Sequence, residues 1–421
     1  MTMAGTLREH TFAALAVPNF RRYIGGQAVS LIGTWMQTIA QSWLVLQLTG
    51  SGTAVGTVVA LQTVPILLLG PYGGVIADRV DKRRLMIGLQ TMMGVLAFVL
   101  GTLTITGAVE LWHVYTLAVL LGLNNCFEQP ARQSFLLEMV GTENLRNAVS
   151  LQSVLASAAR TVGPAVAGIV IAAGGLGFCF MLNAASFVAV VASLMRLNVS
   201  ELRPSPSTGR ARGQLREGLA YIRRSPGLAV PLMMMALVGC LTFEFQVVLP
   251  VVAEKVFQGG ADAYGFLTAA MGVGAVLGGL AVATWGRTGV RPMVFTALAF
   301  GVLMAAAAVS PSLGVLIAVM VFVGALSTAF TSTTNSSLQL EAAPNMRGRV
   351  MALFSVAFMG STAIGGPVAG WVSEEWGGRA GLALGASACF VAAVMGLFIL
   401  GRDRRAVRRQ TEQVDEPAEC R

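Results

Sequence analysis

The chain has 421 residues, of which 55% are hydrophobic and only 12% are charged. Soluble domains carry about 25% charged residues, so this composition excludes a soluble fold and predicts an integral membrane protein. The formal net charge of +9 does not indicate a nucleic-acid partner, because the basic residues follow a membrane topology.

Twelve apolar runs are long enough to cross a membrane as helices, which takes about 20 mostly apolar residues each. They cover residues 23–47, 53–77, 85–106, 111–131, 147–173, 177–197, 228–250, 264–285, 291–309, 312–334, 350–372 and 380–400. Membrane-spanning β-strands are excluded, since they are about 10 residues long and alternate in polarity. We therefore predict an all-helical protein with twelve transmembrane helices, numbered here in this order.

Basic residues gather in the loops on one side of these predicted helices. The loops on the other side contain only Lys255 and Arg379. Because basic loops stay in the cytoplasm, we expect both termini on the cytoplasmic side. The excess of arginine over lysine, with abundant alanine, glycine and valine, suggests a GC-rich bacterial genome, and hence a bacterial inner membrane.

The longest break between predicted helices lies between Leu197 and Leu228. It begins with a basic segment rich in proline and serine, which predicts a flexible linker. Residues 214–224 then predict either an amphipathic helix on the inner leaflet or a solvated helix. We expect an N-terminal six-helix bundle (1–197), a linker with a surface helix (198–227), a C-terminal six-helix bundle (228–400) and a cytoplasmic tail (401–421).

An internal repeat supports this division. Leu137-Glu138, Arg146 and Gly163-Pro164 recur as Leu340-Glu341, Arg349 and Gly366-Pro367, each 203 positions later (340 − 137, for example). Parallel repeats of this kind place two bundles about a pseudo-two-fold axis along the membrane normal.

The turn at residues 73–86, GGVIADRVDKRRLM, joins predicted helices 2 and 3 and contains six charged residues. It resembles the signature loop of the major facilitator superfamily, G-x-x-x-D-R-x-G-R-R/K, with Asp81 where many members have glycine. Other segments are similar to the bacterial exporter branch related to the enterobactin exporter: 19–23, 33–37, 130–133, 159–164, 245–250 and 264–265. The resemblance covers residues 15–400 and implies that helices 1, 4, 7 and 10 line a central cavity. Thr34 departs from the aspartate of many relatives, and helix 4 lacks the arginine of many drug antiporters.

No residue pattern predicts catalysis or metal binding. His10 and His113 lack acidic or thiol neighbours at triad or metal-ligand spacing, and the five cysteines form no C-x-x-C pair. We therefore expect no enzyme activity, no cofactor and no metal site.

Three charged residues within predicted helices are candidates for a functional role. Arg160 is 13 residues into helix 5, about 20 Å deep, so it must face the bundle interior or a wet cavity. One interpretation is that Arg160 is a counter-ion, either for an anionic substrate or for an acidic side chain that carries a proton. The alternative is a structural arginine. Glu244, in the outer half of helix 7, is either a proton carrier, poised between desolvation and a nearby arginine, or a silent paired glutamate. Glu128, near the inner end of helix 4, fits a structural role somewhat better.

Polar side chains form stripes on the helices that the resemblance places around the cavity. An amide facing lipid is costly, so we expect a wet cavity. The alternative for any one residue is a hydrogen bond between helices, which contributes about 0.6 kcal/mol on average. The predicted cavity-lining residues are Gln37, Gln41, Asn124, Asn125, Gln246, Thr331 and Asn335.

Charged residues at the predicted cytoplasmic loops form a candidate gate: Asp78, Arg79, Arg83, Glu138, Arg146, Glu341 and Arg349. The alternative is that they only set topology. We predict a monomeric transporter that exports a small amphiphilic or siderophore-like molecule, in exchange for protons and in contact with membrane lipids. The alternatives are an importer or lysolipid-type transporter of the same fold, and a non-transporting receptor or scaffold.

Overall fold

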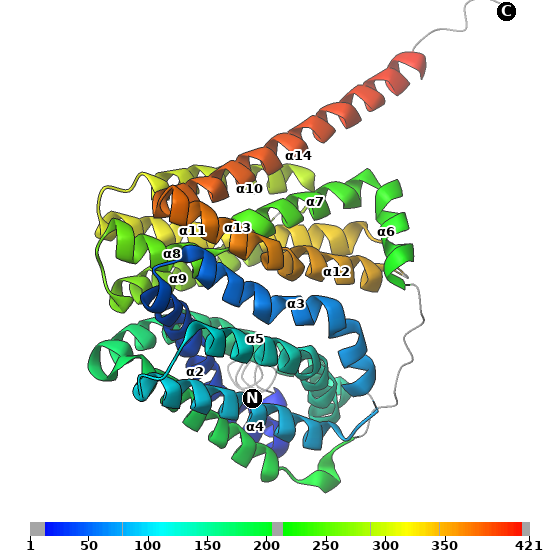
Figure 1. Cartoon of the computed structure of the whole chain (residues 1–421). Coiled ribbons are helices and arrows are strands. Elements are labelled where there is room, and N and C mark those ends of the chain that lie inside the picture. The colour runs from blue at the N-terminus through cyan, green and yellow to red at the C-terminus, as the bar shows by residue number, and fades with distance from the viewer. Residues whose placement is uncertain (1–12, 78, 204–213, 287, 345, 415–421) are drawn as a thin grey trace, which may run out of the picture.

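The computed structural model describes residues 13–77, 79–203, 214–286, 288–344 and 346–414. Every regular element in these ranges is helical, and the helices pack side by side (Figure 1). Nine helices in the described ranges are long and apolar enough to cross a membrane. The prediction of an all-helical membrane protein is therefore confirmed.

The part of the chain before residue 204, here called the first half, contains four long helices. They are α2 (Pro18–Thr49), α3 (Gly52–Ala77), α4 (Lys82–Ile105) and α5 (Leu111–Met195), with the short 3-10 helices Ala13–Ala16 and Val199–Glu201 at either end. Helix α5 folds back twice, at Gly141 (φ 68°) and Gly175 (φ 79°). Only glycine adopts such positive φ angles without strain. Three lengths result, at 111–140, 142–174 and 176–195, and predicted helices 4, 5 and 6 fall on them.

The part from residue 214 onward, the second half, has shorter elements. They are α6 (Gln214–Arg224), α7 (Pro226–Leu241), α8 (Phe245–Val251), α9 (Ala261–Trp285), α10 (Val290–Ala308), α11 (Leu313–Glu341), α12 (Arg347–Ser355), α13 (Thr362–Glu375) and α14 (Gly378–Val414). Predicted helix 7 breaks between α7 and α8, and predicted helix 11 contains a π-helical segment, Val356–Gly360. A second π-helical segment, Val252–Val256, follows α8. Helix α14 continues past the predicted end at residue 400.

Helix α6 packs on the second half. Ile222 is buried, and the Tyr221 hydroxyl accepts a hydrogen bond from the backbone N–H of Ala343 (3.2 Å). Glu217 pairs with Arg349 (2.7 Å). These contacts attach α6 to the start of α12, a placement that neither the membrane-surface nor the solvated interpretation included.

The two ends of the molecule differ in charge. The basic end carries Lys82, Arg83, Arg349 and helix α6, and it lies where α6 and α12 are labelled in Figure 1. The opposite end carries Ser51 and Glu374, where α3 begins and α13 ends.

The two halves meet closely toward the opposite end. There α3 packs against α13, and the second length of α5 packs against α9. A Cβ on Gly56 would collide with the carbonyl oxygen of Gly366, and one on Gly370 would collide with that of Gly52. Small residues let helix backbones approach in this way without a side chain between them.

Candidate functional site

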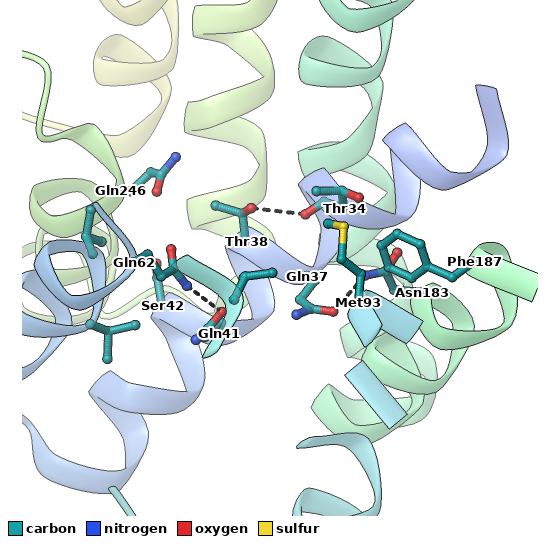
Figure 2. A pocket seen from close by; sticks show the side chains of 13 residues that line it. Thr34, Gln37, Thr38, Gln41, Ser42, Gln62, Met93, Asn183, Phe187 and Gln246 are labelled. Atoms are coloured by element: carbon teal, nitrogen blue, oxygen red, sulfur yellow. Dashed lines mark hydrogen bonds between the residues drawn. The ribbon is translucent and has the colours of Figure 1, made fainter. Parts of the chain in front are cut away.

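A polar cavity lies among helices of both halves (Figure 2). The space open to water is about 50 Å³, enough for a few water molecules, each of which needs about 10–15 Å³ on this measure. Helix α2 supplies Thr34, Gln37, Thr38, Gln41 and Ser42, which share one face through their three- and four-residue spacing. Other polar wall residues are Gln62 of α3, Asn183 of α5 and Gln246 of α8.

Two amide pairs hold the cavity wall in place. Asn183 Nδ2 donates to Gln37 Oε1 (2.6 Å), and Gln62 Nε2 donates to Gln41 Oε1 (3.2 Å). Gly33 makes room for the first pair, because a Cβ there would collide with Asn183 Oδ1. These bonds use the carbonyl groups of both glutamines but not their NH₂ groups. The cavity therefore retains amide donors for a bound polar group.

The cavity contains three of the seven predicted lining residues, Gln37, Gln41 and Gln246. The other four are placed elsewhere. Asn124 is buried, with an Nδ2 that has no partner in the described structure, and Asn125 is half-buried. The Thr331 hydroxyl donates to Ser327 O of its own helix (2.9 Å), and Asn335 Oδ1 accepts from Gln339 Nε2.

Sequence reasoning missed Gln62 and Asn183. Each is a single amide in an apolar run, Ala60-Leu61-Gln62 and Met181-Leu182-Asn183. An amide in such a run is costly unless it finds a partner, which is a usable signal. The partner itself lies 146 positions away for Asn183 and 21 for Gln62.

Glu244 is buried at the break between α7 and α8. Its backbone (φ −80°, ψ 37°) departs from helical geometry, which lets α8 start in a new direction. A Cβ on Gly365 would lie 2.9 Å from Glu244 Oε1, and one on Gly366 would lie 3.6 Å from Oε2, so the carboxyl group rests against α13. Oε1 has no hydrogen-bond partner within the described ranges. An unsatisfied buried oxygen is rare and marks a functional candidate.

Arg160 lies on the second length of α5 with its guanidinium 5.0 Å from the ring centroid of Trp35. This is cation–π geometry. The side chain is exposed in the structure and does not line the polar cavity. It forms no ion pair with any carboxylate in the part of the chain that the structure describes, Glu244 included.

Glu128 has partners of its own. Arg132 Nε lies 3.2 Å from Glu128 Oε1, one helical turn along α5. Gln90 Nε2 of α4 donates to the same oxygen (3.4 Å). Both Glu128 and Gln90 are buried. This geometry favours the structural interpretation of Glu128 over a proton-carrying one.

Where the described gate residues form side-chain contacts, these contacts stay within one half; Asp78 lies outside the described residues. Glu138 pairs with Lys82 (2.8 Å), and both side chains are at least 90% buried. Arg83 donates to the carbonyls of Leu194 and Met195, both at 2.8 Å, and so caps the end of α5.

Of the remaining gate residues, two are exposed and two contact neighbours in their own half. Arg79 and Arg146 are exposed. Arg349 pairs with Glu217 of α6, and Glu341 lies against Gly227, where a Cβ would be 2.9 Å from its Oε1. In this conformation the side-chain contacts of the described gate residues therefore link neighbours within a half.

Bonds between the halves occur instead at the opposite end. Glu374 Oε2, at the end of α13, accepts from Ser51 Oγ (2.6 Å) and from the backbone N–H of Thr53 (3.0 Å). Lys255 Nζ donates to the carbonyl oxygen of Gly50 (2.7 Å). We call these three bonds the Glu374 latch. No sequence argument had singled out Glu374.

Comparison with known proteins gives a match over nearly the whole chain. The family model described as transmembrane secretion effector, one of the major facilitator families, matches residues 9–418. The chain is 24% identical to macrolide efflux protein A of Streptococcus pyogenes, over 78% of this chain and 82% of that protein. It is 24% identical to the enterobactin exporter EntS of Escherichia coli, over 84% and 85%. The chain spans only 50% and 62% of the length of two further curated relatives.

A solved structure shares the fold. A bacterial homologue of the iron transporter ferroportin, in an inward-facing state, superposes with a TM-score of 0.69 over 90% of this chain and 98% of that one. Sequence identity in this comparison is 16%. The likeness therefore concerns the fold alone.

Proposed function

We propose an export function from one premise: the chain belongs to the transmembrane secretion effector family of the major facilitator superfamily. It is a multi-pass membrane transporter and not an enzyme. Within that class, we infer that it exports a small amphiphilic or siderophore-like molecule across a bacterial inner membrane, with protons moving the other way.

The inferred arrangement has twelve spans in two six-helix bundles. Helices α2, α3 and α4 and the three lengths of α5 supply six spans in the first half. The pairs α7–α8 and α12–α13, with α9, α10, α11 and α14, supply six in the second. The kinks at Gly141 and Gly175 support this division of α5. The basic end is cytoplasmic in this proposal, which places both termini in the cytoplasm.

Alternating access accounts for the asymmetry between the two ends. The Glu374 latch and the glycine contacts of α3 with α13 join the halves at the outer end. The ion pairs of the described gate residues at the basic end stay within each half. This is the pattern of an inward-facing state, in which substrate enters from the cytoplasm. Closing the gate residues across the halves would accompany opening of the outer side.

The observation that carries the proposal is the polar cavity built from both halves. Amides from α2 and α8 face one small space, so a rocking motion of the halves would change that space directly. Arg160 supplies a cation on the same first half for an anionic group of the substrate. Glu244 supplies the proton site, and its contact with Gly365 and Gly366 connects it to the helix that closes the outer end.

Transport in everted membrane vesicles tests the proposal. Vesicles with and without the protein would be energised and offered enterobactin or a macrolide as probes. We expect accumulation in the vesicles and alkalinisation of their lumen, because export from a cell becomes uptake into an everted vesicle. Equal accumulation with and without the protein would contradict export of both probes. Uptake into right-side-out cells but not into everted vesicles would identify an importer.

A matched pair of variants connects transport to the cavity. Gln41→Leu removes an amide from the cavity wall, whereas Gln47→Leu changes an exposed glutamine further along the same helix. Loss of one hydrogen-bonding group costs about 0.5–1.5 kcal/mol, so we expect a roughly two- to tenfold loss of uptake in Gln41→Leu only. Equal effects of the two substitutions would place the substrate elsewhere.

A further inference from the structure

A second, apolar groove lies on the first half between α4 and the last length of α5. Its space is about 470 Å³. These two helices pack side by side at the edge of the molecule away from α10 and α14 (Figure 1). Phe187 lines both this groove and the polar cavity.

Small residues on both helices line the groove. Gly94 of α4 lies so close to the last length of α5 that a Cβ there would be 3.1 Å from Phe187 Cβ, and Ala184 and Ala185 also line the groove. Phe98 and Met181 line it as well, and most of the other lining side chains are apolar.

The polar side chains on the wall of the groove are directed to other partners. The Thr91 hydroxyl donates to Ile87 O of its own helix (2.8 Å), and Gln90 Nε2 donates to the buried Glu128. A polar ligand would therefore lose hydrogen bonds to water without regaining them, whereas a hydrocarbon chain would not. From Met181 to Met195 the groove follows 14 residues of helix, about 21 Å at about 1.5 Å per residue. This exceeds one leaflet's share, about 15 Å, of a hydrocarbon core about 30 Å thick.

Arginines surround the Met195 end of the groove. Arg83 is held there by its bonds to Leu194 O and Met195 O. Arg196 follows Met195 directly, and Arg84 precedes Thr91 by seven residues, on the same face of α4; both are exposed. Two acids lie near this end: Asp81 Oδ1 accepts from the backbone N–H of Arg84, and Glu201 Oε1 accepts from Asn198 Nδ2. The balance at this end is therefore cationic.

We propose that this groove binds an anionic phospholipid of the leaflet at the basic end. One acyl chain lies in the groove along Gly94 and Ala185, and the phosphate lies at Arg84 and Arg196. The apolar walls select a chain, and the arginines select a negative headgroup over a neutral or zwitterionic one. The proposed export function does not depend on this lipid site, so the two proposals can be tested separately.

Native mass spectrometry of the full chain tests the site. The protein would be released into neutral detergent from vesicles of equimolar phosphatidylglycerol and phosphatidylcholine. A basic residue near the surface favours an anionic lipid by about 1 kcal/mol, or about fivefold, so two arginines predict a preference of roughly twentyfold or more. We expect one phosphatidylglycerol molecule to stay bound to the protein, with this preference over phosphatidylcholine. Equal retention of the two lipids would overturn the proposal.

Two matched pairs of variants locate the lipid. Ala185→Trp fills the groove, and Leu182→Trp adds the same ring at an exposed position outside it on the same helix. We expect only Ala185→Trp to lose the bound lipid, and Ala192→Phe serves if that variant does not fold. The double change Arg84→Gln with Arg196→Gln should abolish the headgroup preference, while Arg291→Gln in the second half should not. A lipid retained equally by both tryptophan variants, or a preference that survives the arginine changes, would refute the assignment.

Discussion

Replacing Glu374 with alanine should release the outer closure. Glu374 Oε2 accepts two bonds from the other half, from Ser51 Oγ at 2.6 Å and Thr53 N at 3.0 Å. Hydrogen bonds to a charged group contribute about 1.5–3 kcal/mol each when buried. Glu374 is exposed, so solvent screening lowers the total to about 1–2 kcal/mol. That energy corresponds to a roughly five- to thirtyfold shift away from the inward-facing state.

Distance measurements between two spin labels at the outer end would report this shift. Labels at Ala108 and Pro311, both exposed there in different halves, would be introduced without the five native cysteines. We expect a longer-distance population to grow in Glu374→Ala. Glu375→Ala is the matched control, because Glu375 is the exposed neighbouring acid with no bond to the first half in the described structure. An unchanged distribution in Glu374→Ala, or the same change in Glu375→Ala, would refute the latch.

Three further predictions concern the interior. Glu244→Gln removes the titratable group but keeps its size, so substrate-driven proton movement in proteoliposomes should disappear while binding survives; persistent coupling would exclude Glu244 as the proton site. Lys82→Met leaves the buried Glu138 carboxylate without its 2.8 Å partner. Breaking a buried ion pair in this way typically destabilises a protein by about 3–5 kcal/mol, so the Tm in detergent should fall by several degrees. Arg21→Met, at an exposed site, should not lower the Tm in this way. Cysteines that replace Gln37 and Gln246 should react with a membrane-impermeant thiol reagent, and bound substrate should protect them. A cysteine that replaces Thr331, which lies outside the cavity wall, should not react. Inert cysteines at both cavity positions would contradict an aqueous pathway.

Much of this molecule was predictable from composition along the chain. Apolar runs, basic loops and isolated amides are local features, and the cost of placing a charge or an amide in lipid depends little on the rest of the fold. This is why the spans at α3, α4 and α9 were anticipated, and why Gln37 and Gln41 were selected before the cavity was seen. The family resemblance of the 73–86 turn is equally local.

Pairing was decided only when the helices packed. Glu374 bonds to residues more than 320 positions away, and Asn183 bonds to Gln37 across 146 positions. Arg83 was predicted at a gate. In the structure its guanidinium group donates to the backbone carbonyls at the end of α5, because that helix end lies next to it. Likewise, Glu244 stood in a continuous apolar run, and only the packing of α7 and α8 against Gly365 shows that the helix breaks there. A sequence lists which groups need partners, whereas the partners depend on distances that only the packed tertiary structure sets.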